Sequence, residues 1–148
     1  MLTNHQKNLA TLMHLSTFCR FIIPFGNFIG PVVLWITNKE KSEFVDNHGK
    51  QAINFQISIL LYTILLGFLF IPFFIFKIFN HIDLFELNAF EGIHINLSEP
   101  SPLFILGGSL GFIAVIGFIL ELIFIINASI KAKDGQMYQY PLSIHFLK

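Results

Sequence analysis

The sequence has 148 residues, of which 54% are hydrophobic and 12% charged, and its formal net charge is zero. Soluble domains carry about 25% charged residues, so this chain is too poor in charge to cover a water-soluble surface. Its mean hydropathy of +0.68 indicates an integral membrane protein. Because the chain has no net positive charge, nucleic acid is excluded as an expected partner.

The apolar runs predict an all-α fold, a bundle of four membrane helices in one membrane domain covering residues 1–148. The first helix, about 5–23, ends at the turn signal Pro24-Phe25-Gly26. The second, 27–37, rises only about 15 Å, so whether it crosses fully stays open. The third, 44–79, is long enough to cross. The fourth, 102–131, begins after Ser101 with Pro102 in its first turn and ends at Lys131.

The placement of lysines predicts the orientation of these helices. Lys39, Lys41 and Lys50 surround the second connection, whereas the polar loop 80–101 contains four acidic residues and no Lys or Arg. Positive residues favour the cytoplasmic side, so both termini are expected there and the loop 80–101 outside. This predicts a multi-pass protein of the bacterial inner (cytoplasmic) membrane. If the first two apolar runs formed one crossing, the chain would instead have three spans.

Arg20 and Glu121 are charged residues inside predicted membrane helices, at similar estimated depths. An unpaired charge there costs at least about 3 kcal/mol, so each is expected to find a partner, and they are candidates for each other. The pair either belongs to a polar pathway or locks two helices together.

A polar stripe follows one face of the third helix as it enters the membrane. Its members are spaced by three or four residues, which keeps them within one helical face. The residues are His48, Gln51, Asn54, Ser58 and Tyr62, with Asp46 two residues before His48. The stripe either lines a cavity, docks another protein or packs inside the bundle.

Small and helix-perturbing residues indicate close helix packing. Gly30 and Pro31 lie within the short second helix, and Gly107 and Gly111 form a small-xxx-small pair in the fourth. The fourth helix could pack against the third or against another copy. No catalytic, cofactor or metal motif is recognised, so no cofactor is expected.

The segments Asn27-Phe28-Ile29-Gly30-Pro31, Leu34-Trp35 and Phe44-Val45-Asp46-Asn47-His48-Gly49-Lys50-Gln51-Ala52-Ile53-Asn54-Phe55-Gln56 carry a family resemblance. They resemble a family of small, largely uncharacterised bacterial membrane proteins. That family is similar to the channel-forming subunit of the chloroplast inner-envelope protein translocon, the Tic complex. The resemblance implies four helices with both termini on one side. It implies no catalytic residue.

Two classes of function follow from these expectations. In the first, the chain is a non-enzymatic accessory or scaffold subunit of a larger inner-membrane assembly, in protein translocation or membrane-protein biogenesis. It would contact the lipid bilayer and either another membrane protein or a second copy. In the alternative, it is a small oligomeric channel or transporter that uses Arg20, Glu121 and the polar stripe.

Overall fold

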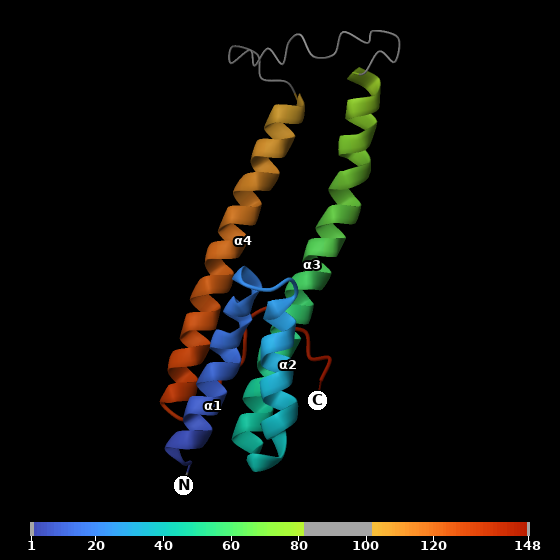
Figure 1. Cartoon of the computed structure of the whole chain (residues 1–148). Coiled ribbons are helices and arrows are strands. Elements are labelled where there is room, and N and C mark those ends of the chain that lie inside the picture. The colour runs from blue at the N-terminus through green and yellow to red at the C-terminus, as the bar shows by residue number, and fades with distance from the viewer. Residues whose placement is uncertain (1, 82–101, 148) are drawn as a thin grey trace. The chain divides into compact units, whose positions relative to one another are not determined.

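The computed structural model describes residues 2–81 and 102–147, which form four α-helices and two short 3-10 helices and, over those residues, no strand (Figure 1). The elements are α1 (Asn4–Leu15), η1 (Ser16–Phe21), α2 (Gly26–Asn38), η2 (Lys39–Lys41), α3 (Glu43–His81) and α4 (Pro102–Lys133). The predicted all-α class with four helices is confirmed. Residues 82–101 of the predicted external loop lie outside the described part.

The chain divides into two compact units. The first contains Met1–Tyr62 and Ile119–Lys148, and the second contains Thr63–Phe118. In the first unit, α1, α2, the beginning of α3 and the end of α4 lie side by side (Figure 1). All the polar contacts described below belong to the first unit.

Local sequence signals explain where the helices begin and end. Thr3 and Gln6 form a capping box at the start of α1, since each side chain accepts a hydrogen bond from the other's backbone N–H. Ser42 Oγ accepts from Val45 N at 3.2 Å, which caps the start of α3. At the end of α4, Gly135 adopts φ 77° and Gln136 N donates to Lys131 O at 2.9 Å. This is a Schellman ending, which needs a residue that tolerates positive φ.

The predicted first helix is not α-helical throughout. It changes to a 3-10 helix at Ser16, where Ser16 Oγ donates to Met13 O and Thr17 Oγ1 donates to His14 O, both at 2.7 Å. Hydroxyl groups that bond to the preceding turn compete with the regular helical pattern and often bend a helix. The tighter helix brings the backbone of Ser16 and Cys19 against α2, at Gly30 and Gly26 respectively.

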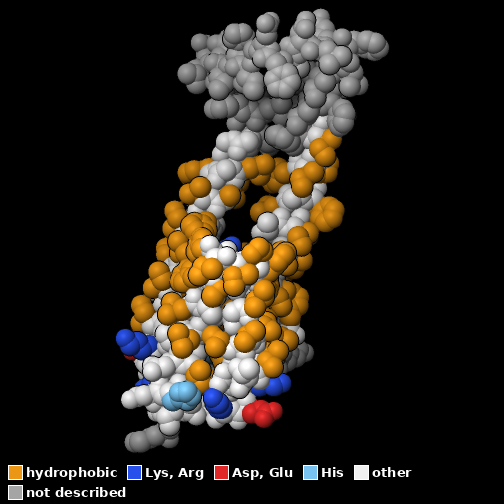
Figure 2. Space-filling model, in the orientation of Figure 1, with side chains coloured by type: hydrophobic (Ala, Val, Ile, Leu, Met, Phe, Trp, Pro, Cys, Tyr) orange, Lys and Arg blue, Asp and Glu red, His pale blue; other side chains and the backbone are white. Residues whose placement is uncertain are grey.

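Two of the four helices are long and apolar enough to cross a membrane, over Glu43–Pro72 and Gly107–Lys133. With 12 and 13 residues, α1 and α2 rise only about 18 and 20 Å. The face shown in Figure 2 is covered by hydrophobic side chains, while the visible Lys, Asp, Glu and His side chains gather toward one end. We call this the polar end, and define it by Lys7, Lys39, Lys41, Glu43, Lys131 and Lys133.

Two small apolar clusters hold the first unit together. The first joins α1, α3 and α4 through residues that include Met13, Val45 and Ala132. The second contains Phe55, Ile125 and Ala128, and also Tyr140, which comes after α4. The segment that follows α4 is therefore part of the core, and we call its described residues, 136–147, the tail.

Candidate functional site

The polar stripe of α3 binds the tail of the same chain. Asn54 Oδ1 accepts from Phe146 N at 3.2 Å and Leu147 N at 2.9 Å, and Asn54 Nδ2 donates to Leu147 O at 3.0 Å. Ser58 Oγ accepts from Ile144 N at 2.8 Å. Tyr62 Oη donates to Leu142 O at 2.7 Å. Every one of these tail groups is main chain.

This contact gives the stripe a defined role within the molecule. An extended segment lacks the internal hydrogen bonds of a helix, so its buried backbone groups need partners elsewhere. Asn54 and Ser58 are almost completely buried and supply these partners. Asp46, at the beginning of α3, does not bind the tail in this way. It accepts a hydrogen bond from Trp35 Nε1 of α2 at 2.8 Å and forms an ion pair with Lys50 of α3 at 2.6 Å.

His48 belongs to a second buried group. Its Nδ1 lies 2.8 Å from His14 Nε2, and its Nε2 lies 3.2 Å from Gln136 O. On the other side, the hydroxyl of Tyr140 lies 2.9 Å from His14 Nδ1. The three side chains thus form one chain of hydrogen bonds that links α1, α3 and the tail.

The carbonyl at one end of this chain fixes the direction of every bond. Gln136 O can only accept, so His48 Nε2 donates to it and His48 Nδ1 accepts from His14 Nε2. His14 Nδ1 then accepts from the Tyr140 hydroxyl. Each imidazole donates one bond and accepts one, as a neutral histidine does. All these groups are satisfied, so the chain serves to hold three segments in register.

Tyr140 also packs through its ring, which stacks on Phe55 with 4.1 Å between centroids and 11° between planes. Burial raises the pKa of the Tyr140 hydroxyl well above its usual value of 10.0, and the nearby Tyr138 and Glu121 add to this rise. The hydroxyl therefore remains a hydrogen-bond donor. The sequence analysis did not single out Tyr140, because nothing in the sequence links it to His14.

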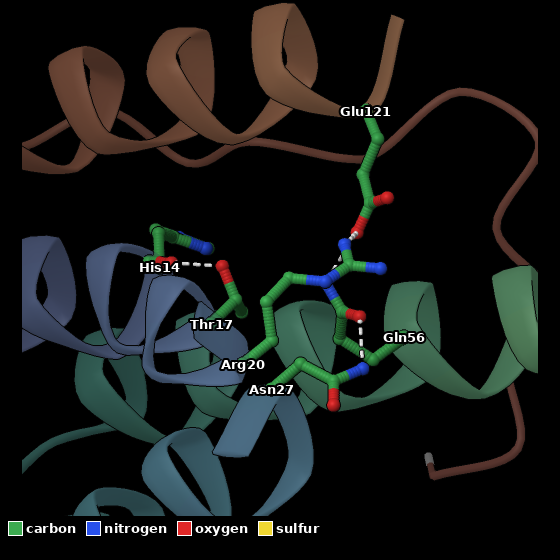
Figure 3. Close-up of polar contacts among 6 residues, drawn as sticks. All are labelled: His14, Thr17, Arg20, Asn27, Gln56 and Glu121. Atoms are coloured by element: carbon green, nitrogen blue, oxygen red, sulfur yellow. Dashed lines mark hydrogen bonds and ion pairs between the residues drawn. The ribbon is translucent and has the colours of Figure 1, made fainter. Parts of the chain in front are cut away.

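Arg20 and Glu121 contact each other, Arg20 Nη1 against Glu121 Oε1 (Figure 3). Glu121 is 5% exposed and Arg20 30%. Gln56 Nε2 donates to the same carboxylate oxygen at 3.4 Å, and Asn27 Nδ2 donates to Gln56 Oε1 at 2.9 Å. One polar network thus joins η1, α2, α3 and α4. Gln56 was missed because it lies on another helical face than the stripe.

A cavity of about 250 Å³ lies between the beginning of α3 and the tail. Its lining includes Glu43, Asn47, Gln51 and, from the tail, Gln139 and His145. Gln51 Oε1 is buried without a hydrogen-bond partner. In the described part of the chain, no three His, Cys, Asp or Glu side chains are grouped closely enough to share a metal ion.

The predicted packing glycines differ in their surroundings. A Cβ on Gly30 would lie 2.6 Å from Ser16 O, so a close approach between η1 and α2 requires glycine there. The neighbouring Pro31 is buried. At Gly107 and Gly111, no described atom lies within 4 Å of such a Cβ. Packing of that pair against another copy stays a prediction.

Comparison with known proteins corrects the resemblance drawn from the sequence. Residues 5–147 match the magnetosome magnetite crystal formation protein family. No curated protein and no solved structure matches the chain. The resemblance to relatives of the Tic channel subunit is therefore wrong, and with it the prediction of a role in protein transport. Since the match covers nearly the whole chain, this protein belongs to the magnetosome magnetite crystal formation protein family.

Proposed function

We propose that this protein is a non-enzymatic membrane accessory protein of magnetite crystal formation. The family match over residues 5–147 is the observation that carries the proposal. The two helices with the length and composition of membrane spans support a membrane location. We further propose a multi-pass protein of the bacterial inner membrane with the polar end on the cytoplasmic side, in accord with the lysines there.

The non-enzymatic role is supported by how the reactive side chains are used. His14 and His48 each use both ring nitrogens in hydrogen bonds, and Glu121 pairs with Arg20. Groups engaged in this way hold helices together, which is a structural use of these side chains. The oligomeric channel or transporter would need the same groups to line a path, so we do not favour it.

The proposed partners follow from the surface. Lipid would contact the apolar faces of the helices, and another membrane protein or a second copy would link this chain to the process. Nucleic acid is not a proposed partner, because the chain has no net positive charge.

Deletion of the gene in its magnetite-forming host tests the role. We expect crystals of altered size or shape in electron micrographs, and restoration by the wild-type gene. Unchanged crystals in the deletion strain would contradict the proposal.

A second set of strains tests the proposal that the protein is not an enzyme. Glu43 and His145 are titratable residues that line the cavity. The variant Glu43→Gln/His145→Asn should restore crystals as well as the wild type, at equal protein abundance on immunoblots. Failure of this variant at normal abundance would indicate that the cavity takes part in a reaction or binds an ion.

A further inference from the structure

We propose that residues 4–41 form a re-entrant hairpin whose tip, residues 22–25, lies among lipid acyl chains inside the bilayer. In this arrangement α1 and η1 enter from the polar end, and α2 returns to the same side without crossing. The inference rests on the proposed membrane location and is independent of the role in crystal formation.

The length of the returning helix is the first support. With 13 residues, α2 rises about 20 Å, against about 30 Å for the hydrocarbon of a bilayer. It ends at Asn38, and Lys39 and Lys41 follow at the polar end. A helix anchored there by lysines cannot reach the opposite surface.

The composition of the tip is the second support. Ile22 is 81% exposed and Phe25 71%, and Phe21 and Ile23 are also exposed. No charged residue occurs between Arg20, which pairs with Glu121, and Lys39. A turn at a water interface is normally polar, whereas this one presents only large apolar side chains. Lipid acyl chains are the partner that fits such a surface.

Several backbone groups of the tip form hydrogen bonds within the protein, as a segment surrounded by lipid requires. Ile22 N and Ile23 N both donate to Cys19 O, at 3.0 and 2.9 Å, and Gly26 N donates to Ile23 O at 2.9 Å. Pro24 has no N–H to satisfy. Phe25 O accepts from Phe28 N and Ile29 N, at 2.9 and 3.0 Å. Non-helical backbone in hydrocarbon must be satisfied within the protein, and these bonds satisfy four polar backbone groups of residues 22–25.

The neighbours of the tip place it within the candidate spans. Asn27 contacts Gln56, which lies inside the span Glu43–Pro72, and Arg20 contacts Glu121, inside Gly107–Lys133.

Site-directed spin labelling of the full chain tests the hairpin. Cys19 is the only cysteine, so Cys19→Ser provides the background. Single cysteines replace Asn4, Ile29, Phe25, Ile22 and Lys39, and the labelled proteins are reconstituted in phosphatidylethanolamine/phosphatidylglycerol vesicles. Collisions with oxygen report lipid, and collisions with a water-soluble nickel chelate report water. The ratio of oxygen to nickel collisions should be at least tenfold higher at Ile22 and Phe25 than at Asn4 and Lys39, with Ile29 between them.

Each other result has a distinct meaning. The proposal would be overturned if the spin label at position 25 collided with nickel as often as the label at position 39. It would also be overturned if a cysteine at position 25 reacted with an impermeant thiol reagent from the side of the membrane opposite Lys39. A label at Phe68, an exposed residue of the apolar part of α3, is the control. If Phe68 also meets water, the membrane location itself has failed, and with it the proposed function. If only the tip meets water, only the hairpin is wrong. The tip side chains are largely exposed, so labelling them leaves the core intact.

Discussion

Arg20 and Glu121 are buried to different extents, so the loss of stability should differ according to which of the two side chains is removed. Glu121 is 5% exposed and keeps only the 3.4 Å contact with Gln56 when Arg20 is removed. Arg20 is 30% exposed and has a long side chain, so it can reach polar surroundings when Glu121 is removed. The buried carboxylate therefore depends more on the arginine than the reverse.

A double-mutant cycle measures this dependence. Arg20→Met should lower the free energy of unfolding by about 3 to 5 kcal/mol, because it leaves an uncompensated buried charge. Glu121→Leu should cost less, and the double variant should be more stable than Arg20→Met alone. The measurement is reversible unfolding in detergent micelles. Additive effects would show that the two side chains do not interact.

The Tyr140 hydroxyl tests the chain of hydrogen bonds through the histidines. Tyr140→Phe keeps the ring on Phe55 but leaves His14 Nδ1 buried without a donor, at a cost of about 1 to 3 kcal/mol. His14 cannot adopt the other tautomer without forcing His48 Nε2 to face Gln136 O as an acceptor. Tyr138→Phe is the matched control, since Tyr138 does not take part in this chain of hydrogen bonds and is only partly buried.

The same hydroxyl predicts a dependence on pH. The folded pKa of Tyr140 is raised above the unfolded value of 10.0, so the unfolded state loses its proton first. Stability from this group is complete below pH 10.0 and decreases as pH rises further, with a slope of at most about 1.4 kcal/mol per pH unit. The difference between wild-type and Tyr140→Phe unfolding curves at increasing pH isolates the effect. A constant difference above pH 10 would contradict the assigned environment.

At the level of elements, replacing a glycine by alanine shows whether close helix packing at that position stabilises the fold. Gly30→Ala would place a methyl group 2.6 Å from the backbone oxygen of Ser16, which cannot move without displacing η1. We expect a loss of about 1 to 3 kcal/mol, as for other overpacked sites. Gly111→Ala meets no described atom within 4 Å and should gain about 0.5 to 1 kcal/mol from helix propensity. Thermal unfolding in micelles compares the two, and a destabilised Gly111→Ala would show that another surface packs there.

The elements also show what the sequence could predict. Apolar runs and capping residues such as Ser42 and Gly135 determine the helices locally, so their number and type could be read from the chain. The depth of Arg20 and Glu121 could be estimated from helical rise, which made them candidates for each other. The family was not identified from the sequence in this way, and the resemblance to relatives of the Tic channel subunit was wrong.

The position of the tail could not be predicted, for a physical reason. Asn54, Ser58 and Tyr62 bind main-chain groups of the tail, and main-chain groups are the same in every sequence. The turn before that segment has Leu142 at positive φ, where a glycine would have signalled it. A polar stripe entering a membrane therefore indicates that partners exist, but not whether they belong to the same chain.

For the whole molecule, two long helices and a returning hairpin predict which segments share one side of the membrane. In the proposed topology each of α3 and α4 crosses once, so residues before α1, between α2 and α3, and after α4 should all lie together at the polar end. In the Cys19→Ser background, single cysteines at Asn4, Lys41 and Asp134 should react with an impermeant thiol reagent from the same side of sealed vesicles. A cysteine at Glu91, in the loop outside the described residues, should react only from the other side. Reaction of position 4 together with position 91 would establish a single crossing by α1 and α2, giving three spans. The lysines at the polar end argue for the first result, because Lys7, Lys39 and Lys131 would then all remain on the side that positive residues favour.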